Sequence, residues 1–87
     1  MDIPLGSVVI ALAGRDKDKY FIVTSMLDEC FVFIADGRTR KVSTPKKKKI
    51  KHLKFIEAPD SIILESLKKD NLTNSMLRKT LSRFSLS

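Results

Sequence analysis

Short apolar segments recur at intervals of about ten residues through the first two-thirds of the chain, and this spacing constrains the fold more than any other feature. Residues 8–13, 20–27 and 30–35 are rich in β-branched and aromatic side chains, and each segment is followed by a glycine or by acidic turn residues. No helical pattern separates the segments, which excludes a βαβ unit. We therefore predict a small antiparallel β-barrel or sandwich, with residues 30–35 as an interior strand.

Two further strands are predicted downstream. Asp36-Gly37 is a two-residue hairpin signal, because both central residues of that turn type need positive φ. A fourth, polar strand over residues 38–42 would follow it, and residues 53–56 suit a short fifth strand. A barrel this small needs large apolar side chains in its core. The aromatic residues expected there are Phe21, Phe31, Phe33 and Phe55.

The pattern becomes helical after Pro59. An acidic or hydroxyl side chain at positions 60–61 can cap a helix over residues 62–69, and a polar side chain at 73–75 can cap a second helix ending near residue 84. Leu77, Leu81 and Phe84 share one face of that second helix. The sequence thus predicts a β domain over residues 1–57 and a two-helix extension over residues 58–87, with the apolar stripe packed on the barrel.

Several classes of protein are not expected from this composition. The longest apolar runs have six residues, too few to span a membrane, and the first residues lack the pattern of a secretory signal. One cysteine, Cys30, cannot form an intramolecular disulfide and is expected to be a buried, inert thiol. With His52 as the only histidine, no metal site, cofactor motif or catalytic set is evident. We therefore expect a cytoplasmic protein without enzymatic activity, metal or cofactor.

The positive charge is concentrated in one segment. Residues 37–56 contain nine Lys and Arg residues and no Asp or Glu, within a chain of net charge +7. A solvated surface usually intersperses the two signs, and crowded lysines repel one another unless an anion relieves the repulsion. We predict that this segment binds a polyanion, with nucleic acid the leading candidate. The cations are Arg38, Arg40, Lys41, Lys46, Lys47, Lys48, Lys49, Lys51 and Lys54.

A second candidate site is the loop after the first apolar segment. Arg15, Lys17 and Lys19 alternate there with Asp16 and Asp18. Such alternation is typical of a self-neutralising surface, but a glycine beside basic residues also lets a backbone approach a phosphate. The neighbouring Tyr20 has two open roles, either stacking on a base or filling the barrel rim.

Residues 4–30 resemble the KOW motif of ribosomal proteins and transcription elongation factors. The motif alternates apolar residues around a required glycine, and here residues 8–13 precede Gly14, which Arg15, Lys17 and Lys19 follow. The family often has a second glycine where this chain has Asp18, a residue that tolerates a left-handed backbone. Residues 33–42 look like the segment that follows this motif in large-subunit ribosomal proteins of archaea and eukaryotes, and short bacterial KOW-domain proteins combine such a barrel with a lysine-rich loop.

This resemblance covers residues 4–56 and implies an SH3-like barrel of the KOW type that binds ribosomal RNA or another structured RNA. It assigns RNA contacts to Gly14 and to the two groups of basic residues given above. The ribosome or a ribosome-assembly protein would then be a further partner. Two alternatives remain. A protein-interaction module would leave Leu77, Leu81 and Phe84 exposed, and a binder of anionic membrane surfaces would use the lysines alone.

Overall fold

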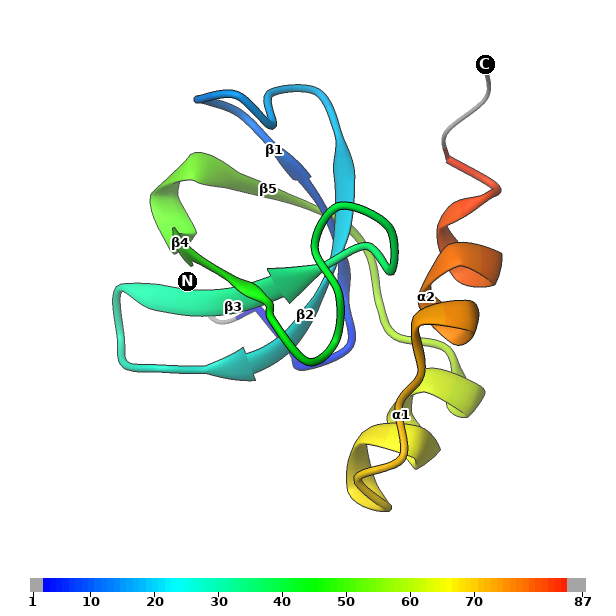
Figure 1. The fold of residues 1–87 in the computed structure, drawn as a ribbon. Coiled ribbons are helices and arrows are strands. Elements are labelled where there is room, and N and C mark those ends of the chain that lie inside the picture. Colours follow the sequence, from blue (N-terminus) through cyan, green and yellow to red (C-terminus); the bar gives the residue numbers. More distant parts are fainter. Residues whose placement is uncertain (1–2, 85–87) are drawn as a thin grey trace.

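The computed structural model describes residues 3–84, which form one five-stranded antiparallel sheet and two short helices (Figure 1). The predicted mainly β class is confirmed. A 3-10 turn, η1 (Ile50–His52), joins the last two strands. The strands run in the order β4-β3-β2-β1-β5 across the sheet. Their bounds are β1 (Val8–Ala11), β2 (Tyr20–Met26), β3 (Phe31–Ala35), β4 (Lys46–Lys49) and β5 (Leu53–Glu57), and the helices are α1 (Ser61–Lys68) and α2 (Asn74–Leu81).

The sheet is strongly curved because its two edge strands, β4 and β5, are consecutive in the chain. In a flat sheet these edges would lie about 19 Å apart, which is four strand spacings of about 4.8 Å. The three residues of η1 rise only about 6 Å. Irregularities in the pairing of β1 with β5 and of β2 with β3 assist the bend. Figure 1 shows the strands curling around a common interior.

Each face of the curved sheet carries a buried hydrophobic cluster. Strand residues point alternately to the two sides, so Phe21 and Val23 enter the interior cluster whereas Ile22 packs outward. The interior cluster also contains residues from β1, β3 and β5. The outer cluster joins Ile22 and Val8 to the two helices. The fold therefore has two small cores that share one sheet.

The helices begin where the sequence predicts and cover the outer face of the sheet. Asp60 caps α1 by accepting a hydrogen bond from the Ile63 backbone N–H at 2.8 Å, and Thr73 caps α2 in the same way from Met76 at 3.2 Å. Leu77 is fully buried in the outer cluster. Leu81 is buried beside it, and Phe84 packs partly buried against the same cluster. The expected packing of the tail on the β region is confirmed.

The predicted fourth strand is wrong in position. Residues 38–42 form a loop, and the strand is instead the lysine run of β4, which pairs with β3. The carboxylate of Asp36 accepts hydrogen bonds from the backbone N–H groups of Arg38 and Arg40, at 2.8 and 2.9 Å. Val42 donates its backbone N–H to the Asn74 side chain. These backbone groups are therefore satisfied within the loop and by α2. Only Gly37 of the predicted hairpin pair has positive φ.

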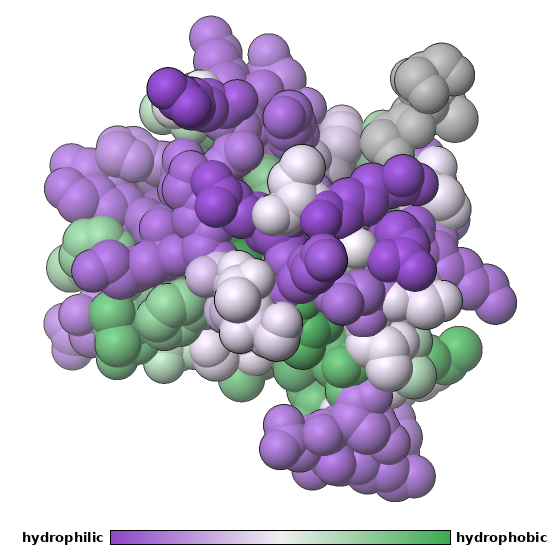
Figure 2. Space-filling model, viewed as in Figure 1, coloured by the Kyte–Doolittle hydropathy of each residue, from purple (hydrophilic) through white to green (hydrophobic). Residues whose placement is uncertain are grey.

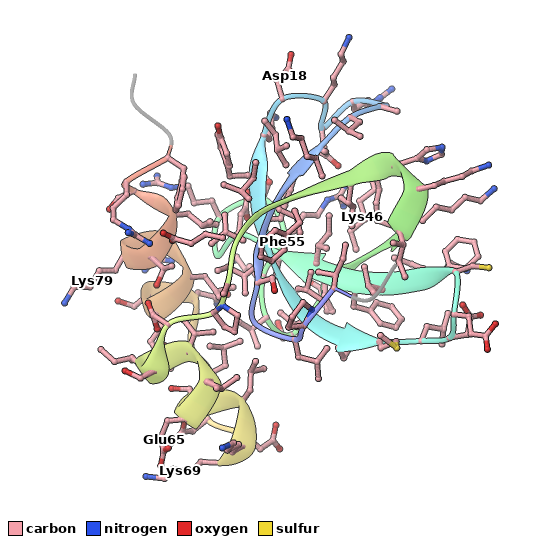
Figure 3. All side chains as sticks on the ribbon, turned by 180° about the vertical axis from the view of Figure 1, so that it is seen from behind. Asp18, Lys46, Phe55, Glu65, Lys69 and Lys79 are labelled. Atoms are coloured by element: carbon pink, nitrogen blue, oxygen red, sulfur yellow. The ribbon has the colours of Figure 1, made fainter. Side chains whose placement is uncertain are left out.

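Two expectations about burial are also wrong. Cys30 is exposed, because the turn before β3 extends to it: Asp28 accepts hydrogen bonds from the backbone N–H groups of both Cys30 and Phe31. Of the four aromatic residues assigned to the core, only Phe21 is fully buried. Phe55 on β5 is 42% exposed and is labelled in Figure 3, which views the molecule from the side opposite to Figure 1. Phe31 and Phe33 are half-buried on the outer face of β3, where Val32 and Ile34 occupy the inner positions.

Candidate nucleic-acid interface

The loop between β1 and β2 is a tight turn that exposes its cations. Gly14 has a φ of 81° and Asp18 a φ of 70°, so both adopt the left-handed conformation that the sequence suggests. The backbone N–H of Asp18 donates to the Ala11 carbonyl at 2.8 Å and so closes the loop. Arg15, Lys17 and Lys19 are exposed around it. This loop supplies one group of predicted RNA contacts in an accessible position.

Asp16, in contrast, is buried and connects this loop to the lysine-rich segment. Its carboxylate accepts a hydrogen bond from Lys46 Nζ at 2.7 Å and lies 3.9 Å from the Arg40 guanidinium. Lys48 Nζ donates to the neighbouring Ala13 carbonyl at 3.0 Å. Asp16 therefore neutralises cations about 30 residues away rather than its neighbours in the loop. These contacts place the two predicted basic segments side by side.

The same contacts control the charge of Asp16. The hydrogen bond from Lys46 lowers the pKa of the Asp16 carboxyl, the charges of Lys46, Arg40 and Lys48 lower it further, and burial partly offsets them. A carboxyl whose pKa is lower in the folded chain than in the unfolded chain stabilises the fold above its unfolded pKa. That stabilisation is lost as the pH falls through the folded pKa.

We therefore expect Asp16→Asn to lower the free energy of unfolding by about 1–2 kcal/mol at neutral pH, because the ion pair with Lys46 is lost and only a weaker hydrogen bond to the amide oxygen can replace it. The difference from the wild-type chain should shrink as the pH falls below about 4, because the wild-type carboxyl then becomes protonated as well. Thermal unfolding at several pH values measures both effects. The exposed Asp18→Asn is the matched control, and an Asp16→Asn effect that does not depend on pH would contradict the ion-pair explanation.

The four lysines of β4 divide into two pairs according to the face of the strand. Lys46 and Lys48 lie opposite Ile34 and Val32 on the inner side, and Lys48 is only 8% exposed. Figure 3 shows Lys46 inside the curve of the sheet. The other two lysines lie on the outer side, with their ammonium groups 5.1 and 5.9 Å from the centre of the Phe31 ring. This outer pair consists of Lys47 and Lys49.

The exposed cations form what we call the basic surface. It lies on adjoining elements: the β1–β2 loop, the loop before β4, and the segment from β4 through η1 to β5. Of the twelve predicted cationic contacts, three are not exposed: Lys48 is buried, and Arg40 and Lys46 are half-buried beside Asp16. The basic surface comprises Arg15, Lys17, Lys19, Arg38, Lys41, Lys47, Lys49, Lys51 and Lys54. Gly14, which is also a predicted RNA contact, is exposed in the β1–β2 loop, and Lys48 Nζ lies close to its backbone.

A groove adjoins this surface where the loop over residues 36–45 meets α2. Arg78 Nη1 donates to the Gly37 carbonyl at 2.8 Å, and Asn74 Oδ1 accepts from the Val42 N–H at 2.8 Å. Figure 1 shows the loop lying between the sheet and α2. The groove has a volume of about 530 Å³, and Tyr20, Arg38, Arg78 and Phe84 are among its lining residues. The sequence did not indicate that Arg78 contacts the basic loop. Helix spacing relates Arg78 only to nearby positions and not to Gly37, which is 41 residues earlier in the chain.

Hydrophobic side chains are gathered elsewhere. Figure 2 shows a mostly hydrophilic face, with hydrophobic residues over the β2–β3 hairpin at the lower left and a second group near the bottom centre. Met26 and Leu27, at the end of that hairpin, are about half exposed, at 49% and 51%. Within residues 3–84, neither helix is long and apolar enough to cross a membrane. In the same range, no three His, Cys, Asp or Glu side chains lie close enough to hold a metal ion.

The basic surface and the groove beside it are the features of the fold that bear on function. No protein-family model matches it, and no curated protein sequence matches it significantly.

Proposed function

We propose that the protein is a non-enzymatic RNA-binding module that contacts structured RNA mainly through phosphates. The observation that carries the proposal is the contact between Asp16 and Lys46, which unites two basic segments from distant parts of the sequence. The β1–β2 loop and residues 37–56 together hold twelve Lys and Arg residues against two Asp, whereas the rest of the chain holds five against eight acids. A charge asymmetry of this kind attracts polyanions and accelerates their association.

We further propose that the sheet is an SH3-like barrel of the KOW type. Two observations support this proposal. Only three residues link the two edge strands, and the interior cluster contains side chains from β1, β2, β3 and β5. The positive φ at Gly14 and Asp18 fits the two turn positions of the KOW loop. With this resemblance, ribosomal RNA is the favoured ligand, the ribosome or an assembly protein a further partner, and the cytoplasm the expected location.

Binding of this kind would have low sequence specificity. Lysines act as point charges on phosphates, and Phe21 is buried while the Phe31 ring already packs against Lys47 and Lys49. The alternative, a protein-interaction module, requires that the apolar stripe of α2 (Leu77, Leu81 and Phe84) be exposed. Leu77 and Leu81 are buried and Phe84 is partly buried against the outer cluster, so most of this stripe is covered by the sheet rather than offered to a partner protein.

The salt dependence of RNA affinity tests the proposal. With five or six phosphate contacts, the logarithm of the association constant should fall against the logarithm of salt concentration with a slope of about −4 to −5. Fluorescence anisotropy of a labelled RNA hairpin, titrated between about 50 and 200 mM salt, measures this slope. A slope shallower than about −2 would contradict a mechanism led by phosphates.

The lysine run supplies matched variants for the same assay. Replacing both Lys47 and Lys49 by Gln should make the slope less negative by up to about 2 without unfolding the chain, because both are exposed. The same change at Lys68 and Lys69 on α1 is the control and should leave the slope unchanged. Loss of affinity that is equal in the two double variants would mean that only net charge matters, not the basic surface.

A further inference from the structure

We propose that the groove beside α2 binds one unpaired nucleotide of the RNA, with its base stacked on Tyr20. This inference rests on the proposed function and adds a second kind of contact to it. The groove volume of about 530 Å³ lies within the range of small-molecule sites, about 300–1,000 Å³. The groove is formed by four segments: the end of the β1–β2 loop, the start of β2, the loop that begins at Asp36, and the end of α2 with the residues after it.

The aromatic part of the groove is packed against neighbouring side chains. The rings of Tyr20 and Phe84 have their centres 5.3 Å apart at an angle of 32°. The Arg83 guanidinium lies 5.0 Å from the centre of the Phe84 ring, and Arg83 is itself bound to Glu57 at 2.5 Å. Tyr20 is half-buried against the outer core, which restricts its ring, and it still lines the groove. A preorganised ring of this kind is a suitable platform for a base, which is stacked with little further loss of conformational entropy.

The groove also carries donors suited to a phosphate. Lys19 and Arg38 are exposed at its rim. The guanidinium of Arg78 is oriented by its hydrogen bond to the Gly37 carbonyl and keeps further N–H donors for a ligand. At β4 the Lys47 and Lys49 ammonium groups already lie over the Phe31 ring, whereas Tyr20 lines the groove beside Lys19, Arg38 and Arg78. The combination matches a nucleotide, which has both a flat base and an anionic group.

Two carboxylates favour an unpaired base over a duplex. Asp18 and Asp36 line the groove, and Asp18 lies at the tip of its loop (Figure 3). The Asp36 oxygens also accept hydrogen bonds from the Arg38 and Arg40 backbone N–H groups and from the Thr39 hydroxyl, which fix the position of the carboxylate. Carboxylates can accept hydrogen bonds from the N–H groups of a base, such as the N3–H of uracil, and those on a paired base are engaged by its complement.

The chain provides its own probe of this site, since it contains one tyrosine and no tryptophan. Single-stranded oligouridine and a blunt RNA duplex of equal phosphate number are titrated into the wild-type protein. Tyrosine fluorescence reports the groove, and anisotropy of a label on the RNA reports binding. We expect both RNAs to bind but only the single strand to quench Tyr20. Equal quenching by the duplex, or single-strand binding with no quenching, would overturn the inference and leave the proposed function intact.

Variants provide the second readout. Tyr20→Leu should weaken oligouridine binding about tenfold and leave duplex binding unchanged, whereas Tyr20→Phe retains the ring and should bind both RNAs as the wild type does. Thermal unfolding checks that each variant is folded, and the wild-type titration decides the question if Tyr20→Leu is not. Lys79→Glu, on an exposed part of α2 outside the groove, controls for charge (Figure 3). If neither RNA changes the anisotropy, the proposed function itself fails.

Discussion

Deletion of residues 60–87 is expected to abolish cooperative unfolding of the remaining β region. The helices bury Ile63, Leu77 and Leu81 against the sheet, and each fully buried side chain of this size contributes about 1.5–3 kcal/mol. The total of about 5–9 kcal/mol is comparable to the whole stability of a domain of this length, about 4–13 kcal/mol at typical values per residue. Circular dichroism during heating, compared with the full chain, measures the effect.

Single substitutions on α2 separate packing from chain length. Leu77→Ala creates a cavity in the outer cluster and should lower the free energy of unfolding by about 2–5 kcal/mol. Lys79→Ala, two residues away and exposed, should change it by less than about 0.5 kcal/mol. A truncated chain that melts at the wild-type temperature would show that the helices do not contribute to the core.

Gly37→Ala is expected to be the most damaging small substitution in the loop before β4. Gly37 has a φ of 80°, a conformation that costs a residue with a Cβ about 1–2 kcal/mol. The added methyl group would also meet the backbone carbonyl of Asn74, and would lie 3.1 Å from the Arg78 side chain. We expect a total loss of about 3 kcal/mol, which lowers the melting temperature of a domain of this size by roughly 12–24 °C.

Gly14→Ala provides the matched control for the backbone cost alone. Gly14 has nearly the same φ, 81°, but a Cβ there would approach only the flexible end of Lys48, at 3.3 Å from Nζ. Its expected loss is about 1–2 kcal/mol, or about 4–16 °C. Equal destabilisation by the two alanines would mean that contact between Gly37 and α2 is unimportant.

Elements with a strong local signal were predictable from the sequence. The segments that became β1, β2 and β3 are runs of β-branched and aromatic residues, and both helices start at side chains that can cap them. The left-handed backbone at Asp18 was expected from the resemblance to the KOW loop, because Asp tolerates this conformation better than most residues. Each of these features depends on neighbours within a few positions in the chain.

The strand of four lysines was not predictable in the same way. Lysine has a low strand propensity, and the segment before it has the stronger local strand signal. What makes β4 a strand is its pairing with β3 and the contacts of Lys46 and Lys48 with the β1–β2 loop, about 30 residues earlier. The prediction of the candidate site residues was incomplete for the same reason. Charge density identified the basic segments, but only the tertiary contacts distinguish the two structural lysines of β4 from the two exposed ones.

The pairing of β1 with β5 has a consequence for how the chain is made. Residues more than 40 positions apart, such as Ala11 and Leu53, must meet before β1 has both of its neighbours. During synthesis from the N-terminus, the whole lysine run therefore emerges before the strand that completes the sheet. Contacts of such long sequence separation also slow folding, because the intervening loop must close first. A nascent chain of this protein thus presents its most cationic segment to its surroundings before the sheet can be completed.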